Sequence, residues 1–160
     1  MYRARKSASD DAYFENMTRV VFMAGLSWKT IGRKWSDFRK NFNNFSVDQV
    51  ARFDEKKIQQ LMNDASIVRN KAKIIATINN AKRFHSIKQN YGSFQQYLDN
   101  LDKSSNYALV IKDLGKKFSR IGPSSARIIL YSVGEDIKRP MEQSQTRTRG
   151  ERFDYGSVVM

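Results

Sequence analysis

Residues 71–90 read KAKIIATINNAKRFHSIKQN, and this stretch decides the fold class. Its apolar side chains recur every three or four positions, which places them on one face of a helix. The members of this stripe are Ile74, Ile78, Ala81, Phe84 or His85, and Ile87 or Lys88. Because Asn70 is a favourable N-cap, the sequence predicts a long central helix from Lys71 to Asn90.

Apolar residues recur at the same spacing in the segments before and after this central helix. No proline occurs before Pro123, and no sustained alternation of apolar and polar residues indicates strands. Further helices are expected at 10–23, 28–42, 54–62, 93–101, 107–118 and 124–133, with a short one beginning at Ser46. Favourable N-caps precede several of them, at Ser9, Ser27, Ser46 and Ser93. We therefore predict an all-α, compact, multi-helix domain.

The 160-residue chain has the length of about one domain. We expect residues 1–140 to form a single helical domain and residues 141–160 to form a basic, flexible C-terminal tail. The net charge is +13, from 29 Lys and Arg against 16 Asp and Glu. So basic a domain favours a polyanionic partner. Solubility, or adaptation to an unusual cytoplasm, is the alternative explanation of the charge.

Several classes of protein are excluded by composition. The chain has no cysteine and one histidine, so it has neither disulfides nor an ordinary zinc site. No run approaches the roughly 20 apolar residues that a membrane-spanning helix needs. The basic N-terminus is not followed by the apolar core of a secretion signal. We therefore expect a cytoplasmic protein, monomeric by default, with no metal, no cofactor and no membrane association.

The segment Phe118–Ser–Arg–Ile–Gly–Pro–Ser–Ser–Ala126 lies between two predicted helices. A short glycine turn exposes backbone amides at the start of the second helix, where the amides and the helix dipole suit a phosphate oxygen. Hydroxyl groups and cations surround the turn. The predicted DNA-binding residues are Lys116, Lys117, Arg120, Gly122, Ser124, Ser125 and Arg127. An ordinary glycine-capped corner between helices is the alternative.

This turn resembles the helix-hairpin-helix motif, whose usual pattern is Leu-Pro-Gly-Ile-Gly-x-Lys-Thr-Ala. The matching positions are Phe118, Ile121, Gly122, Ser125 and Ala126. Ser119 and Arg120 stand at the places of the proline and the first glycine. Ser124 stands where bifunctional glycosylase/lyases carry their nucleophilic lysine. The resemblance therefore implies a DNA-binding hairpin without lyase activity.

A longer resemblance runs from about Tyr13 to Gly134. Its segments are 24–31 (AGLSWKTI), 64–74 (DASIVRNKAKI) and 78–84 (INNAKRF), with Phe38–Arg39, Phe42, Phe45 and Gly92–Phe94 between and after them. In order and spacing these are similar to 3-methyladenine DNA glycosylase I, a family of helix-hairpin-helix glycosylases. The resemblance implies base-excision repair, in which a damaged, alkylated purine is flipped out of the duplex and its N-glycosidic bond is hydrolysed.

The same resemblance implies a base pocket. Trp28 aligns with the family's stacking tryptophan, and Tyr13 and Phe22 are further candidates for the pocket wall. The family's pocket glutamate, eight residues before this tryptophan, falls on Val20. A contact that reads the edge of the base is therefore missing. The family's zinc ligands are missing too, with Arg139 at one of the histidine positions.

A catalytic carboxylate has two candidates. In the wider superfamily an aspartate follows the hairpin, and the same interval after Gly122 reaches Glu142, with Asp136 as the second choice. Such a carboxylate would stabilise the developing sugar cation or activate water. The competing interpretation is a solvated charge at the edge of the tail. A cationic alkylated base is already a good leaving group, so weak assistance would suffice.

These observations leave three functions to compare. The retained Trp28 and hairpin favour a monofunctional DNA N-glycosylase that acts on double-stranded DNA with damaged bases. The valine at position 20 favours a catalytically inactive DNA-binding protein on the same scaffold. An RNA-binding or scaffold protein that binds through the basic tail is a weaker third interpretation.

Overall fold

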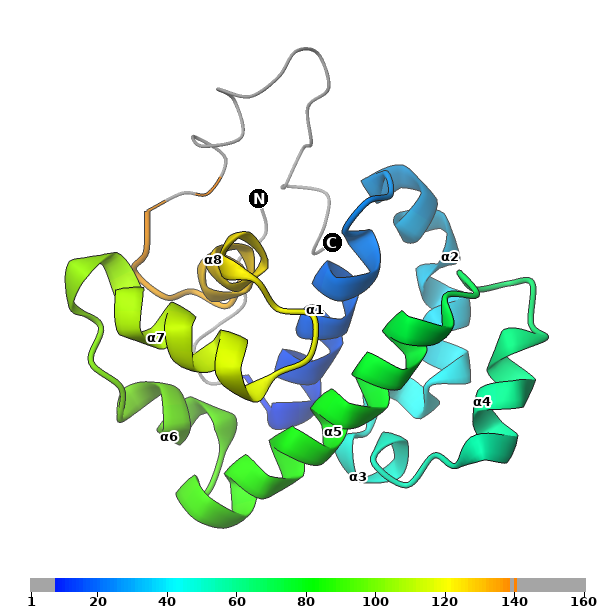
Figure 1. The fold of residues 1–160 in the computed structure, drawn as a ribbon, viewed down its shortest axis with the longest axis horizontal. Helices are drawn as coiled ribbons and strands as arrows, with labels where there is room; N and C mark the ends of the chain where they lie inside the picture. Colours follow the sequence, from blue (N-terminus) through cyan, green and yellow to red (C-terminus); the bar gives the residue numbers. More distant parts are fainter. Residues whose placement is uncertain (1–7, 139, 141–160) are drawn as a thin grey trace.

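Helices form all the regular secondary structure in the part of the chain that the computed structural model describes, residues 8–138 and Pro140 (Figure 1). The elements are α1 (Asp10–Met23), α2 (Trp28–Asn41), the 3₁₀ turn η1 (Asn43–Phe45), α3 (Val47–Val50), α4 (Glu55–Met62), α5 (Lys71–Tyr91), α6 (Phe94–Asp99), α7 (Ser104–Lys117) and α8 (Pro123–Ser132). The all-α prediction is confirmed. No helix among these residues is both long enough and apolar enough to cross a bilayer.

Short polar side chains cap the starts of α1 to α6, apart from η1. Each accepts a hydrogen bond from the backbone amide three residues further on, which satisfies an amide that the helix itself leaves unbonded. The capping residues are Ser9, Ser27, Ser46, Asp54, Asn70 and Ser93. The caps predicted at Ser9, Ser27, Ser46, Asn70 and Ser93 are confirmed.

Both α7 and α8 begin before their predicted first residues, while α4 and α6 begin one residue later than predicted, directly after their caps. α7 opens at Ser104 with a left-handed turn, in which Ser105, Asn106 and Tyr107 have φ of 54°, 52° and 68°; its right-handed part follows Tyr107, next to the predicted start. α8 begins at Pro123 rather than Ser124. Proline suits the first helical position, since its missing N–H would have no partner inside the helix.

α1 and α5 form the centre of the molecule. In Figure 1 the elements from α2 to α4 lie on one side of this pair and α6 to α8 lie on the other. The predicted stripe on α5 is buried, and Phe84 and Ile87 rather than His85 and Lys88 continue it. α5 is therefore the central helix that its periodicity indicates.

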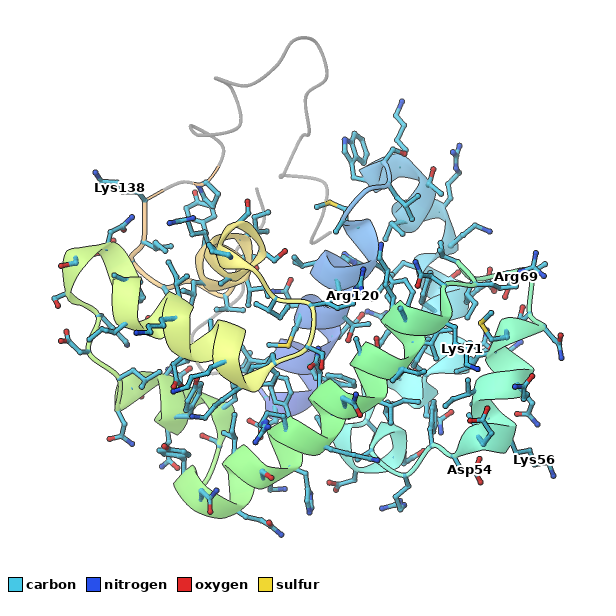
Figure 2. All side chains as sticks on the ribbon, in the orientation of Figure 1. Asp54, Lys56, Arg69, Lys71, Arg120 and Lys138 are labelled. Atoms are coloured by element: carbon cyan, nitrogen blue, oxygen red, sulfur yellow. The ribbon has the colours of Figure 1, made fainter. Side chains whose placement is uncertain are left out.

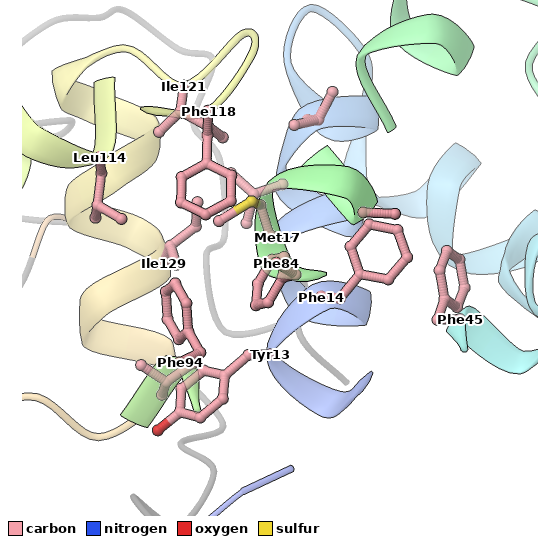
Figure 3. Close-up of a cluster of buried hydrophobic side chains, with 14 of the residues drawn as sticks. Tyr13, Phe14, Met17, Phe45, Phe84, Phe94, Leu114, Phe118, Ile121 and Ile129 are labelled. Carbon is pink, nitrogen blue, oxygen red and sulfur yellow. The ribbon is translucent and has the colours of Figure 1, made fainter. Parts of the chain in front are cut away.

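An aromatic cluster joins the two sides of the fold (Figure 3). The ring of Phe84 lies 5.6 Å from Phe14, 4.8 Å from Phe94 and 5.3 Å from Phe118, measured between ring centroids. Phe14 in turn contacts Phe45 at 5.9 Å. Phe118 is the residue at which α7 ends, so this core fixes where the turn toward α8 begins.

Candidate nucleic-acid interface

The turn between α7 and α8 presents backbone amides to solvent. Gly122 is the N-cap of α8, no side chain caps this helix, and Pro123 fills its first position. The Ala126 amide makes the first bond inside the helix, to the Gly122 carbonyl at 2.9 Å. The amides of Ser124 and Ser125 precede it at the positive end of the helix dipole. This arrangement suits a phosphate oxygen.

α5 holds the turn in place through side-chain hydrogen bonds. Asn80 accepts the Ser119 amide at 2.7 Å and donates to the Ser119 carbonyl at 3.2 Å. Arg83 Nε donates to the Lys117 carbonyl at 2.9 Å. Asn80 is buried, so solvent competes little for its amide group. The turn is therefore fixed to the central helix as well as to the aromatic core.

Arg120 completes a tight turn at the place where the resemblance expects a glycine. Its φ is 62°, in the left-handed region that costs a residue with a Cβ about 1–2 kcal/mol. Its side chain is exposed, and Figure 2 shows it beside α1 and α5. The left-handed position of the turn is thus filled by an arginine, which adds an exposed cation.

The predicted phosphate-binding cations differ in how they are placed. Lys116 and Arg120 are exposed, and Arg127 is half-buried. Lys117 instead extends along α7, where its amine lies 3.1 Å from Asp113 Oδ2 and 5.6 Å from the centroid of the Tyr97 ring. Its charge is therefore balanced within the protein, and a contact of Lys117 with DNA stays a prediction.

The three aromatic candidates for the base pocket do not share one surface. Trp28 is half-buried at the first position of α2. The Tyr13 ring packs 4.8 Å from Phe94 in the core, and its hydroxyl donates to Gln95 (Figure 3). Phe22 is fully buried, with its ring 4.7 Å from Phe38. Both are core residues here, and their role in a pocket stays a prediction.

A hollow of about 730 Å³ opens between α1 and the outer face of α2. Its lining includes Arg19, Trp28, Lys29, Arg33, Trp35 and Arg39. Trp35 lies in the core beneath this hollow, with only 4% of it exposed. The Arg19 guanidinium covers the Trp35 ring at 4.6 Å from its centroid. Sequence reasoning did not single out Arg19.

Position 20 lies inside the core rather than on this hollow. Val20 is 1% exposed. Glu15, one turn earlier on α1, faces α2, where it accepts hydrogen bonds from Trp35 Nε1 at 2.9 Å and Arg39 Nη2 at 2.7 Å. Glu15 therefore does not stand in for the pocket glutamate that the resemblance implies.

The carboxylates after the hairpin have contrasting environments. Asp136 is exposed, and Glu142 lies outside the described residues. Glu135, which sequence reasoning missed, is fully buried; it accepts the Tyr107 hydroxyl at 2.9 Å and pairs with Lys103 Nζ at 3.1 Å. The Tyr107 oxygen also accepts the Asp136 amide at 3.0 Å. This buried group ties the segment that follows α8 to the start of α7.

The residues of this chain do not fit the zinc site that the resemblance to the family implies. The chain has no cysteine, and its one histidine, His85, is exposed on α5 with Nδ1 3.5 Å from Asp48. No cluster of three or more metal-ligating side chains occurs within residues 8–138. No step is therefore assigned to a metal.

Comparison with known proteins identifies relatives of this fold. The family model for methyladenine glycosylase matches residues 4–126. DNA-3-methyladenine glycosylase 1 of Escherichia coli K12 is 36% identical over 85 residues, which are 53% of this chain and 46% of the E. coli protein. The Haemophilus influenzae DNA-3-methyladenine glycosylase is 27% identical over 85 residues, with the same coverage of each chain. The aligned region thus spans about half the length of these curated relatives.

Solved structures extend the likeness over more of the chain. A variant of 3-methyladenine DNA glycosylase I in complex with 3-methyladenine superposes with a TM-score of 0.70 at 27% identity, covering 79% of this chain and 77% of that chain. The Staphylococcus aureus 3-methyladenine DNA glycosylase I gives a TM-score of 0.69 at 27% identity with the same coverage. With the family model covering most of the sequence, the chain belongs to the methyladenine glycosylase family.

Proposed function

We propose that this protein is a monofunctional DNA glycosylase that removes an alkylated purine from double-stranded DNA. Its relatives are named for 3-methyladenine and for DNA. The observation that carries the proposal is the turn between α7 and α8, whose uncapped amides and exposed cations match the backbone of DNA. We further propose that it acts as a monomer in the cytoplasm and needs no cofactor.

The hairpin would hold the phosphate backbone beside the damaged base. The amides of Ser124 and Ser125 would donate to a phosphate oxygen, and Lys116, Arg120 and Arg127 would supply charge around it. Gly122 at the N-cap leaves the backbone accessible. Ser124 in place of a lysine nucleophile favours simple hydrolysis, which leaves an abasic site and an intact strand.

Trp28 would stack on the extruded base. Its half-buried ring at the start of α2 combines a fixed position with an accessible face. Stacking on an aromatic ring contributes about 1–3 kcal/mol per base. Asp136 and Glu142 remain the proposed carboxylates for stabilising the sugar cation, and a cationic leaving group reduces the assistance that they need to provide.

The experiment is a base-release assay on methylated duplex DNA, with free bases measured by mass spectrometry. We expect wild type to release methylated purines without strand cleavage. Trp28→Ala should lower release roughly tenfold to a hundredfold, from the loss of stacking. Trp28→Phe is the matched control and should keep most of the activity. Strand cleavage without added alkali would contradict the monofunctional assignment.

A DNA-binding protein without catalysis is the second candidate, and the burial of Val20 favours it. In that case wild type would bind the methylated duplex but release no base. Equal affinity of wild type and Trp28→Ala for that duplex, together with absent release, would establish this alternative over the enzyme.

A further inference from the structure

The hollow between α1 and α2 carries an excess of positive charge. Arg19, Lys29, Arg33 and Arg39 all contribute to its lining. The nearby carboxylate of Glu15 is bonded to Arg39 and to the indole of Trp35. One carboxylate therefore faces several cations, and the hollow is suited to an anion.

Arg19 forms a fixed floor for this hollow. Only 9% of the residue is exposed, and its guanidinium lies over Trp35, 4.6 Å from the ring centroid. Burial lowers the pKa of Arg19 to about 10, although Glu15 acts in the opposite direction. The side chain is still charged at neutral pH. Arg19 therefore adds a positive charge of fixed position to the floor of the hollow.

Both tryptophans of the hollow already contact cations of the protein. Lys29 Nζ lies 5.9 Å from the centroid of the Trp28 ring, and Arg19 covers Trp35. At Trp35, which Arg19 covers, a cationic ligand would meet like charge. A phosphate would instead pair with Lys29 and Arg33, which are exposed at the rim.

α1 lines the hollow through Arg19, and α8, which follows the hairpin, packs against α1. Lys73 of α5 donates to the carbonyls of Phe22 at 3.3 Å and Ala24 at 2.6 Å, where α1 ends. Its pKa is lowered by burial and then by the positive charge of Arg120. Figure 2 shows Arg120 of the hairpin beside α1 and α5.

We propose that this hollow is a second DNA-contact site, which binds a backbone phosphate of the same DNA molecule that the hairpin holds. The proposal rests on the DNA binding in the proposed function, but not on base release. It assigns a role to Arg19, Lys29, Arg33 and Arg39 that the hairpin does not require.

Gly32 offers a way to change the charge of the hollow without removing any existing side chain. It lies in the lining, and a Cβ added there meets no other atom within 4 Å. Glycine inside a helix is also unfavourable by about 1 kcal/mol, so longer side chains are tolerated. Gly32→Glu and Gly32→Gln add side chains of nearly the same size, and they differ only in charge.

Binding to an undamaged duplex is measured over a range of salt concentrations. We expect Gly32→Glu to bind roughly tenfold more weakly than Gly32→Gln at low salt, because a carboxylate in the hollow repels phosphate. For every phosphate that the variant no longer neutralises, the slope of log K against log salt should become shallower by about 0.9. Gln60→Glu, on an exposed position of α4, is the matched control for the same charge change and should bind like wild type.

Equal affinities of Gly32→Glu and Gly32→Gln would overturn the proposal, as would an equal loss in Gln60→Glu or a wild type that does not bind the duplex. Displacement of wild type from the duplex by deoxyadenosine monophosphate, but not of Gly32→Glu, would assign the hollow to a free nucleotide instead. Absent base release with the charge effect intact would refute the glycosylase function and leave this site standing. Circular dichroism checks that each variant folds.

Discussion

Replacing Asn80 with alanine should loosen the hairpin without altering any residue on its surface. The change removes two hydrogen bonds to Ser119, at 2.7 and 3.2 Å, each of which contributes about 1 kcal/mol. The half-buried Ser119 amide loses its acceptor, which adds about 1 kcal/mol because water replaces it only in part. Alanine has a more favourable helix propensity than asparagine, which offsets roughly 0.5 kcal/mol of this loss. The expected net loss of stability is about 2–3 kcal/mol.

Asn79 supplies the matched control, since it precedes Asn80 on α5 and is exposed. Asn79→Ala has the same gain in helix propensity and does not alter the bonds to Ser119. Urea unfolding should therefore separate the two variants by about 2–3 kcal/mol. Hydrogen exchange at the Ser119 amide should accelerate, and DNA affinity should fall, in Asn80→Ala alone. Equal unfolding midpoints, with Ser119 protection unchanged, would refute the role of Asn80 in holding the turn.

Two further substitutions test the backbone of the hairpin and the start of α1. Arg120→Gly and Arg120→Ala remove the same charge, but glycine relieves the strain at φ 62°, so the glycine variant should be about 1 kcal/mol more stable by urea unfolding. Equal stability of Arg120→Ala and Arg120→Gly would contradict the left-handed conformation of residue 120. Burial raises the pKa of Asp10 above its ordinary value of 3.8. The hydrogen bond that the Phe94 amide donates to Asp10, at 2.9 Å, acts in the opposite direction but is the smaller effect. Because the pKa of Asp10 is raised on folding, the contribution of this one group to stability is most favourable at low pH and is lost as the pH rises through its folded pKa. Asp10→Asn should therefore raise the Tm at pH 7, and the gain should vanish below about pH 4; a gain independent of pH would contradict this.

The helices could be predicted from the sequence because their causes are local. Apolar spacing of three to four residues defined α5, and Ser9, Ser27, Asn70 and Ser93 indicated the helix starts by chemistry that acts within a few residues. The end of the domain was less predictable. Three consecutive residues with positive φ at the start of α7 have no glycine to indicate them, so the sequence does not predict the left-handed turn that precedes the right-handed part of this helix.

The contacts that build the candidate site could not be predicted because they join distant parts of the chain. Asn80 and Ser119 are 39 residues apart, and nothing local to either one indicates the pairing. The polar Asn80 in the middle of a helix, between buried apolar positions, was the available hint. For Tyr13 and Phe22, the prediction of pocket residues competed with the general tendency of large aromatic side chains to be buried. The structure shows the burial of both.

The carboxylates of α1 do not replace the pocket glutamate that the resemblance implies at position 20, where this chain has a valine. Asp10 accepts the Phe94 amide at 2.9 Å, Asp11 accepts the Val47 amide at 3.0 Å, and Glu15 is bonded to Trp35 and Arg39. Each one is therefore engaged in holding a neighbouring element, while Val20 fills the core. If Trp28 stacks on an extruded base, none of these groups is free to read its edge. Stacking alone accepts every base, so selection of a damaged base would have to come from its weaker pairing in the duplex and from its readiness to leave the sugar.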